Sequence, residues 1–257
     1  MAMLRLRGRP GWATPILLAF ALTAALGSSP DDLPGEEANL LGEVRGIVSY
    51  SGPLLDPIPN FEAASRRDPI EVDPQTLGLK DAVAWLEGVP SREDDDREGA
   101  EEPIEVDQVN FEFIPHVLAV EAGRPVAFLN NDVANHGVTA SSRDARNRFN
   151  VTTPPGGSYT HRFRASRQPV AVGCPVHAAM SAWVFVFDHP YFAITGEDGS
   201  FLIPDVPPGR YTLHVRHVEG GMTDRRPVVV EPGGPTRLRI AFDGDDLNPA
   251  TSRDPSG

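Results

Sequence analysis

The sequence predicts an all-β protein. Turn-forming residues are abundant, with 24 Gly and 26 Pro among 257 residues, and they separate short runs in which apolar and polar residues alternate. Helical periodicity is scarce, so no segment favours a long amphipathic helix. A chain of this length can form one large domain or two small ones, each with a proper core.

The N-terminus has the three parts of a signal peptide. Arg5, Arg7 and Arg9 precede an apolar segment at residues 15–26, and the small residues Ala25 and Gly27 suit cleavage. The apolar run is shorter than the ~20 residues that a membrane-spanning helix needs. We therefore expect residues 1–27 to be removed, leaving a periplasmic or secreted protein with no stable membrane insertion. Residues 28–43 are predicted to be a flexible leader.

Charge and cysteine content narrow the functional classes. The formal net charge is -13, and loss of three arginines with the signal peptide makes the mature chain more acidic still. Such a surface disfavours nucleic acid and anionic membranes as partners. Cys174 is the only cysteine, so no internal disulfide can form. A lone thiol in an oxidising compartment is protected if it ligates a metal.

Cys174 belongs to a segment that also contains His177 and Met180. A thiolate, an imidazole and a thioether on one short loop form a soft ligand set that favours copper over hard cations. A blue-copper site needs a second histidine, and His136, where one strand ends and another begins, is the candidate. Zinc is the main competitor, bound by Cys174, His136 and His177 with His116 as the candidate fourth ligand and without Met180. A metal-free relic of such a site is the remaining alternative.

The elements before this region are expected in the following order. Residues 44–50 alternate and stop at a Gly-Pro turn, which predicts a strand. Residues 56–80 form a proline-rich, charged connection, and residues 81–88 give another strand. Residues 44–90 are assigned to a first sandwich segment, and the acidic residues 91–103 to a solvated linker.

The remaining strands are short and separated by turns. A hairpin is expected around Asp198-Gly199. The predicted strands cover residues 117–120, 125–129, 136–140, 159–163, 170–173, 182–187, 191–195, 200–203, 210–215, 227–230 and 237–242. Residues 243–257 are polar and are predicted to be a disordered tail.

Residues 104–188 resemble a cupredoxin of the amicyanin or plastocyanin type, on the spacing of Cys174, His177 and Met180. The resemblance implies a Greek-key sandwich, an opening hairpin at residues 113–123 and one type 1 copper ion held by His136, Cys174, His177 and Met180. Cupredoxins usually carry Asn after the first ligand histidine, whereas this chain has Gly137. Its backbone N–H is still expected to reach the cysteine sulfur.

Residues 44–90 and 189–242 resemble the two parts of a carboxypeptidase regulatory-like, prealbumin-type β-sandwich. The resemblance rests on the Thr-x-x-Asp-Gly-x-Phe hairpin that begins at Thr195, on the Pro-Pro-Gly-x-Tyr-x-Leu segment that ends at Leu213, and on the Gly-x-Val strand at Gly46. It implies that the cupredoxin-like domain is inserted in this sandwich, as in proteins described as methylamine utilisation-like. Insertion is tolerated where the ends of the insert lie close together.

The function that these features favour is single-electron transfer between redox protein partners, without catalysis. A hydrolase is disfavoured because no glycine-flanked nucleophile is present, and multicopper or binuclear copper chemistry needs more than seven His and one Cys. Two alternatives stay open. One is an extracellular binding module with a carbohydrate-binding-like fold, in which the metal is structural or absent, and the other is copper storage or delivery.

Overall fold

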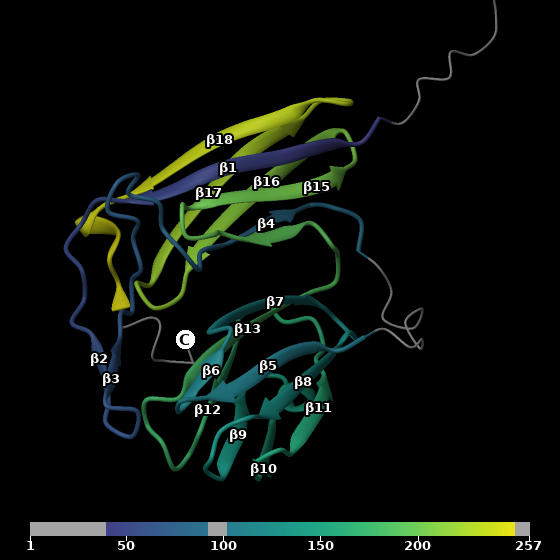
Figure 1. Ribbon diagram of the computed structural model, residues 1–257. Coiled ribbons are helices and arrows are strands. Elements are labelled where there is room, and N and C mark those ends of the chain that lie inside the picture. Colours follow the sequence, from purple (N-terminus) through teal and green to yellow (C-terminus); the bar gives the residue numbers. More distant parts are fainter. Residues whose placement is uncertain (1–39, 92–101, 250–257) are drawn as a thin grey trace, which may run out of the picture. The chain divides into compact units, whose positions relative to one another are not determined.

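The computed structural model describes residues 40–91 and 102–249, which form strands joined by turns and two short 3-10 segments, η2 (Ala145–Asn147) and η3 (Gly244–Asp246) (Figure 1). The predicted all-β class is confirmed. Within the described residues, no helix has the length and apolar character required to cross a membrane. The expected signal peptide and most of the acidic linker lie outside these residues.

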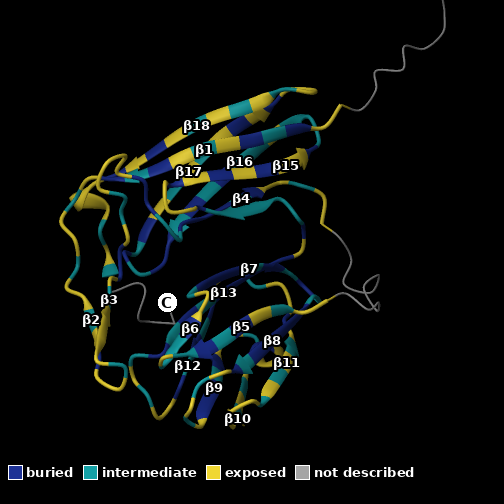
Figure 2. Cartoon of the chain, in the orientation of Figure 1, coloured by how far each residue is buried: buried dark blue, intermediate teal, exposed yellow. Residues whose placement is uncertain are grey.

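Two sheets form the first β-sandwich. Their strand orders are β15-β1-β18 and β14-β4-β16-β17. The strands are β1 (Gly42–Tyr50), β4 (Val83–Glu87), β14 (Phe192–Ile194), β15 (Ser200–Val206), β16 (Gly209–His217), β17 (Met222–Val230) and β18 (Pro235–Phe242). Along β1 and β18, buried and exposed residues alternate (Figure 2). The inward residues build a core that includes Val48, Leu86, Ile203 and Leu213, none of them more than 1% exposed.

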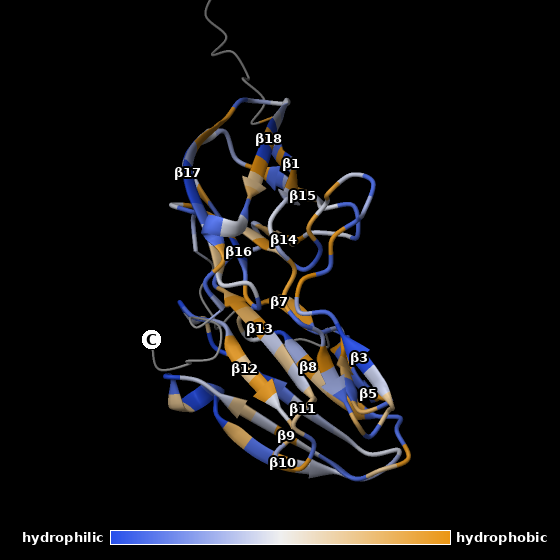
Figure 3. Cartoon of the chain, turned by 90° about the vertical axis from the view of Figure 1, so that its left-hand side faces the viewer, coloured by the Kyte–Doolittle hydropathy of each residue, from blue (hydrophilic) through white to orange (hydrophobic). Residues whose placement is uncertain are grey.

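The strands between β4 and β14 form a second sandwich with its own core. Its sheets have the orders β10-β9-β12-β13-β7 and β11-β8-β5-β6. The strands are β5 (Ile104–Val109), β6 (Glu112–Ile114), β7 (Val117–Glu121), β8 (Pro125–Asn130), β9 (His136–Ser141), β10 (Phe149–Thr153), β11 (Ser158–Arg162), β12 (Val170–Gly173) and β13 (Ser181–Phe187). The parallel pairs β5–β8 and β7–β13 join strands that are distant in sequence, and β13 is hydrophobic along most of its length (Figure 3).

The ends of the insert meet in the first sandwich. β4 and β14 pair antiparallel, with Trp85 opposite Phe192 and Val83 opposite Ile194. The chain therefore leaves and re-enters one sheet on neighbouring strands, which lets the inserted strands form separate sheets without breaking that sheet. The predicted architecture of one β-sandwich inserted in another is confirmed.

A small apolar cluster and a buried ionic group join the two sandwiches. Val83 and Val218 of the first pack against Val117, Phe185 and Phe187 of the second. Beside them, Glu219 forms ion pairs with Arg67 at 3.1 Å and His116 at 3.4 Å, and it accepts the indole N–H of Trp183 at 3.3 Å. Burial alone would raise the pKa of Glu219, but His116 and Arg67 hold that pKa at about 2.

The connection between β1 and β4 has more structure than its composition indicates. It contains a hairpin of β2 (Ile58–Asn60) and β3 (Ser65–Arg67), which pair antiparallel. Ile70 and Leu79 of the same connection are buried in the core of the first sandwich.

Both predicted hairpins are wrong, although the turns are present. β6 pairs with β5 and β7 pairs with β13, so the segment from 112 to 121 passes from one sheet to the other. The Asp198-Gly199 turn likewise connects β14 and β15, which belong to opposite sheets of the first sandwich. β7, β14 and β15 pair instead with strands that are distant in sequence, which are β13, β4 and β1.

The predicted domain limits also need two adjustments. β1 begins at Gly42, inside the expected leader. Part of the expected disordered tail is ordered, because Asp243 and Asp246 form a capping box around η3 and the N–H of Asn248 donates to the carbonyl of Gly220 at 2.9 Å. The tail from residue 250 lies outside the described residues.

Because His217 is only 3% exposed, we predict that the protein loses stability at low pH. The Nδ1 of His217 accepts the Gly220 N–H at 3.1 Å, and burial lowers its pKa to about 4. The unfolded chain takes up this proton near pH 6.5 whereas the folded chain does not. The contribution of His217 to the free energy of unfolding is therefore fully present above about pH 6.5. It falls by roughly 3 kcal/mol as the pH drops to about 4.

In His217→Asn, the amide oxygen can still accept the Gly220 N–H but does not titrate. Urea unfolding at pH 7 and pH 5 should show a smaller drop in the variant than in the wild type. An equal drop in both would contradict the assignment to His217.

Candidate metal centre

Pairing of β9 with β12 brings the upstream histidine to the cysteine loop. Gly173, the last residue of β12, lies opposite Thr139 of β9. Because the strands are antiparallel, the chain that continues past Gly173 runs back along the start of β9, where His136 lies. Cys174 and His136 are therefore neighbours despite a separation of more than thirty positions in sequence.

Three of the predicted ligands converge. The ligand atoms of His136, Cys174 and His177 all lie within 4.8 Å of one another. The two Nδ1 atoms are 3.0 Å apart, and the Cys174 Sγ is 3.5 Å from the His177 Nδ1. A metal ion bound at about 2.0–2.3 Å by nitrogen and sulfur leaves its ligand atoms about 3–4 Å apart. The three donors thus have the spacing of ligands around one ion.

Burial of the three residues is uneven. His136 is 1% and Cys174 7% exposed, while His177 is half-buried on the loop after β12. Its neighbour Val176 is 67% exposed. His177 is therefore the one member of the cluster that approaches the protein surface.

The sulfur of Cys174 accepts a hydrogen bond from the backbone N–H of Gly137 at 3.3 Å. This confirms that the residue after His136 reaches the sulfur without a side-chain tether. The structure also explains the glycine, because a Cβ at this position would lie 2.5 Å from the Cδ of Pro175. Any larger residue, including the Asn usual in cupredoxins, would collide with the proline ring.

Met180, the fourth predicted ligand, is 2% exposed and belongs to the same core cluster as Cys174. The loop between them is closed by two backbone hydrogen bonds. The N–H of Cys174 donates to the carbonyl of Met180 at 3.1 Å, and the N–H of Met180 donates to the carbonyl of His177 at 3.0 Å. These bonds fix the backbone of all three loop residues relative to one another.

Asp132, which the sequence did not single out, orients His136. Its Oδ2 lies 3.1 Å from the Nε2 of His136 and accepts the N–H of Phe111 at 2.8 Å. Burial would raise the pKa of Asp132, but the N–H groups of Phe111 and Val133 and the imidazole of His136 lower it. An ionised carboxylate only accepts, so Nε2 of His136 carries the proton and Nδ1 keeps its lone pair for a metal.

A buried amide network fixes the turn that carries Asp132. Asn130 is fully buried, and its Nδ2 donates to the carbonyls of Ala134 at 2.9 Å and Thr153 at 2.7 Å. Its Oδ1 accepts the N–H of Asp132 at 3.0 Å. The sequence signal was the polar Asn-Asn-Asp run four residues before His136, which reads equally well as an exposed turn.

An aromatic ring covers the two imidazoles. The ring centroid of Phe111 lies 4.9 Å from that of His177 and 5.3 Å from that of His136, with interplanar angles of 86° and 88°. Phe111 follows β5 at the tip of the β5–β6 hairpin. Nothing in its sequence surroundings points to this role, which depends on contacts between distant segments.

His116, the alternative zinc ligand, points elsewhere. Its Nδ1 lies 2.7 Å from the carbonyl oxygen of Ser181, and its Nε2 faces Glu219. His189 stacks on Phe187 at a centroid distance of 5.4 Å, and His217 bonds to the backbone as described above. Among the described residues, the cluster of His136, Cys174 and His177 is the one group of three His, Cys or acidic residues spaced to hold a metal.

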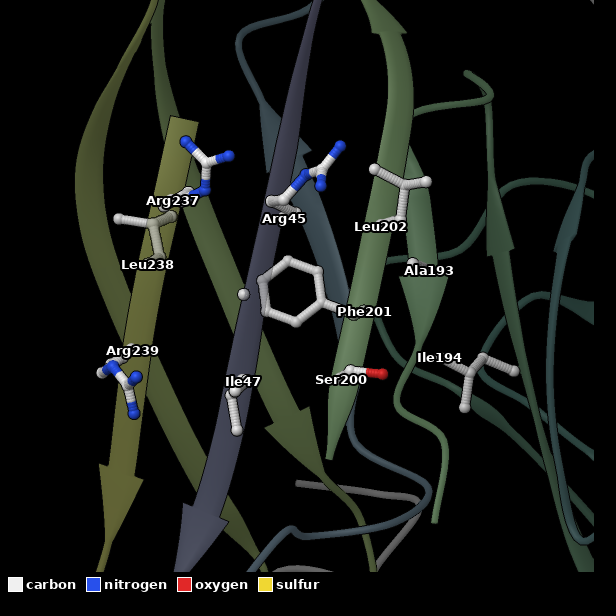
Figure 4. Close-up of a pocket in the computed structure, with 11 residues that line it drawn as sticks. Arg45, Ile47, Ala193, Ile194, Ser200, Phe201, Leu202, Arg237, Leu238 and Arg239 are labelled. Carbon is white, nitrogen blue, oxygen red and sulfur yellow. The ribbon is translucent and has the colours of Figure 1, made fainter. Parts of the chain in front are cut away.

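An open pocket of about 730 Å³ lies on the outer face of the sheet β15-β1-β18, where Arg45, Leu202 and Arg239 are exposed (Figure 4). Its lining includes Arg45, Arg237 and Arg239 together with aliphatic residues, and it contains no histidine, cysteine or carboxylate. It therefore offers neither a metal-binding group nor an acid–base pair. Among the described residues, the group of three side chains spaced to hold a metal lies in the inserted sandwich.

Comparison with known families identifies part of the first sandwich. Residues 177–243 match the family model of the carboxypeptidase regulatory-like domain. The match covers about a quarter of the chain. It begins in the inserted sandwich before β13 and continues through β14 to β18, where it confirms the resemblance predicted for residues 189–242. No curated protein matches the chain.

The chain is also similar to solved structures of cupredoxins. A purple cupredoxin from Nitrosopumilus maritimus is 18% identical, with a TM-score of 0.28, over 32% of this chain and 98% of that one. The reduced Cu(I) form of a P52G amicyanin mutant is 19% identical, with a TM-score of 0.30, over 40% of this chain and 97% of that one.

A Cu-containing nitrite reductase from Thermus scotoductus SA-01 is 19% identical, with a TM-score of 0.32. The match covers 39% of this chain and 26% of the reductase, so this chain spans about a quarter of that protein. The cupredoxin resemblance predicted from the sequence is thus found. The function proposed below rests on the geometry of the site itself.

Removal of the Asp132 carboxylate should weaken metal binding. In Asp132→Ala, His136 loses the acceptor that fixes its tautomer and ring orientation, so we expect about a 10–100-fold loss of metal affinity. Competition for Cu(I) between the protein and a chelator measures it. Asp144→Ala is the control, because Asp144 pairs with Arg146 away from the cluster. Equal affinity in Asp132→Ala and the control would contradict the role of Asp132.

Proposed function

We propose that the protein is an exported single-copper electron carrier, with His136, Cys174 and His177 as equatorial ligands and Met180 as the axial ligand. The observation that carries the proposal is the convergence of two imidazole nitrogens and one cysteine sulfur within 4.8 Å, with His136 and Cys174 buried. Two nitrogens and one thiolate in a plane with a weak axial thioether form the donor set of blue-copper sites. Bound copper would supply a one-electron couple.

The donor set supports copper over zinc. A structural zinc site is completed by a fourth strong ligand, and His116 is engaged with Ser181 and Glu219. The remaining candidate near the cysteine is Met180, a soft thioether that zinc sites do not use but copper sites do. The chain's own residues would therefore leave zinc with three ligands and give copper four.

The surroundings of the cluster support electron transfer without a bound substrate. His136 and Cys174 are buried, and the ring of Phe111 covers both imidazoles. His177 is half-buried next to the exposed Val176. Four protein ligands leave no open position on the metal, so an electron would pass through the imidazole of His177 to a redox protein docked on the adjoining apolar surface.

Titration with Cu(II) tests the proposal. The copper-loaded protein should show the intense visible thiolate-to-copper band of a blue-copper site at one equivalent. Cys174→Ser should abolish the band because the sulfur donor is gone. Tight Cu(I) binding without this band would favour storage or delivery instead, and no copper binding would leave only the binding-module alternative.

Met180→Gln tests the axial ligand separately. Amide oxygen replaces the thioether at a weak axial position, so the copper and its visible band should remain. A harder donor stabilises Cu(II), so the midpoint potential should fall. Voltammetry of both proteins measures the difference. An unchanged potential in a copper-loaded Met180→Gln protein would remove Met180 from the ligand set.

A further inference from the structure

Asn60 lies in the connection between β1 and β4 of the first sandwich. It contacts the β5–β6 hairpin, whose Phe111 covers the metal centre. It ends β2 and is 2% exposed. Its Nδ2 donates to the carbonyl of Asn110 at 3.3 Å and to that of Phe111 at 3.1 Å. Its Oδ1 accepts the N–H of Ala63 at 3.2 Å. Both N–H donors and the carbonyl oxygen of this buried amide therefore have partners, and the two donated bonds reach residues about fifty positions away.

The turn that Asn60 holds is an unfavourable one for its sequence. Val109 pairs with Glu112, so Asn110 and Phe111 are the two turn residues. Their φ angles are 51° and 59°. Asn tolerates the left-handed region, but a bulky residue such as Phe is disfavoured there because its Cβ crowds the backbone. Such a conformation persists only where surrounding contacts enforce it.

The backbone N–H and the backbone carbonyl of Phe111 both form hydrogen bonds, each to a different segment. Its N–H donates to Asp132, which also bonds the imidazole of His136. Its carbonyl accepts from Asn60. With the backbone fixed on both sides, the ring is placed edge-on against His136 and His177.

We propose that Asn60 is a positioning residue through which the regulatory-like sandwich sets the environment of the metal centre. This inference rests on the proposed function for its redox consequence, but its structural part holds for the metal-free protein. By fixing Phe111, Asn60 keeps water from the imidazoles. A site of low polarity favours the form of lower charge, which is the reduced one, so Asn60 raises the midpoint potential.

Asn60→Ala and Asn60→Asp test the proposal in the full-length protein. Both variants leave the carbonyls of Asn110 and Phe111 without the amide donor, while Asn60→Asp keeps an acceptor for the Ala63 N–H and so preserves the β2–β3 turn. Phe61→Ala is the matched control. It changes the neighbouring residue, which is 85% exposed, and leaves the hydrogen bonds from Asn60 to Asn110 and Phe111 in place.

The first readout needs no metal. Amide hydrogen exchange of Phe111 in the metal-free protein should accelerate at least ~10-fold in both Asn60 variants and stay unchanged in Phe61→Ala. Unchanged exchange in the Asn60 variants would overturn the proposal whether or not the protein binds copper. Failure of the wild type to bind copper would refute the proposed function but leave this structural result standing.

The second readout is the midpoint potential of the copper-loaded proteins. We expect both Asn60 variants to shift the ratio of reduced to oxidised protein about tenfold toward oxidised at a fixed potential, which is about 59 mV for one electron. Phe111→Leu, which keeps an apolar side chain but loses the ring, should shift it in the same direction. If Phe111→Leu shifts the potential and the Asn60 variants do not, Asn60 does not position the ring and the proposal fails.

Discussion

The antiparallel pairing of β9 with β12 is the constraint on which the metal centre depends. It sets Gly173 opposite Thr139, so the loop after β12 turns back over the start of β9. The contact between the Gly137 N–H and the Cys174 sulfur follows from this register. A shift by one residue would turn every side chain of β9 to the opposite face and move the His136 imidazole away from the thiol. Sheet register, rather than loop flexibility, therefore brings the three donors together.

The first sandwich contributes to this centre although it supplies no ligand. It holds the ends of the insert through β4 and β14 and contacts the inserted sandwich around Glu219 and the apolar cluster of Val83, Val117 and Phe185. Its β2–β3 hairpin also contacts the β5–β6 turn through Asn60. The interaction of Asn60 with Phe111 makes the outer sandwich part of the immediate surroundings of the imidazoles. A cupredoxin-like domain without this partner would need another way to hold such a turn.

The sequence predicted what depends on local spacing. Cys174, His177 and Met180 lie on one loop, so their donor types and intervals were visible, and the upstream strand boundary pointed to His136. The roles of Asp132, Phe111 and Asn60 were not visible, because their hydrogen bonds span 21 and 51 residues and depend on how sheets meet. The predicted strand at residues 117–120 corresponds to β7, and the hairpin expected at residues 113–123 spans most of β6 and β7. The sequence carried no information about which sheet each strand joins, and the expected hairpin was therefore wrong.

X-ray absorption at the copper edge of the loaded protein tests the central claim most directly, because it reports the atoms bound to the metal. We predict one short copper–sulfur bond from Cys174 and two imidazole nitrogens, with the sulfur contribution lost in Cys174→Ser. A spectrum of the wild type that contains only nitrogen and oxygen neighbours would show that copper binds elsewhere. It would contradict the assignment of His136, Cys174 and His177 as one metal centre.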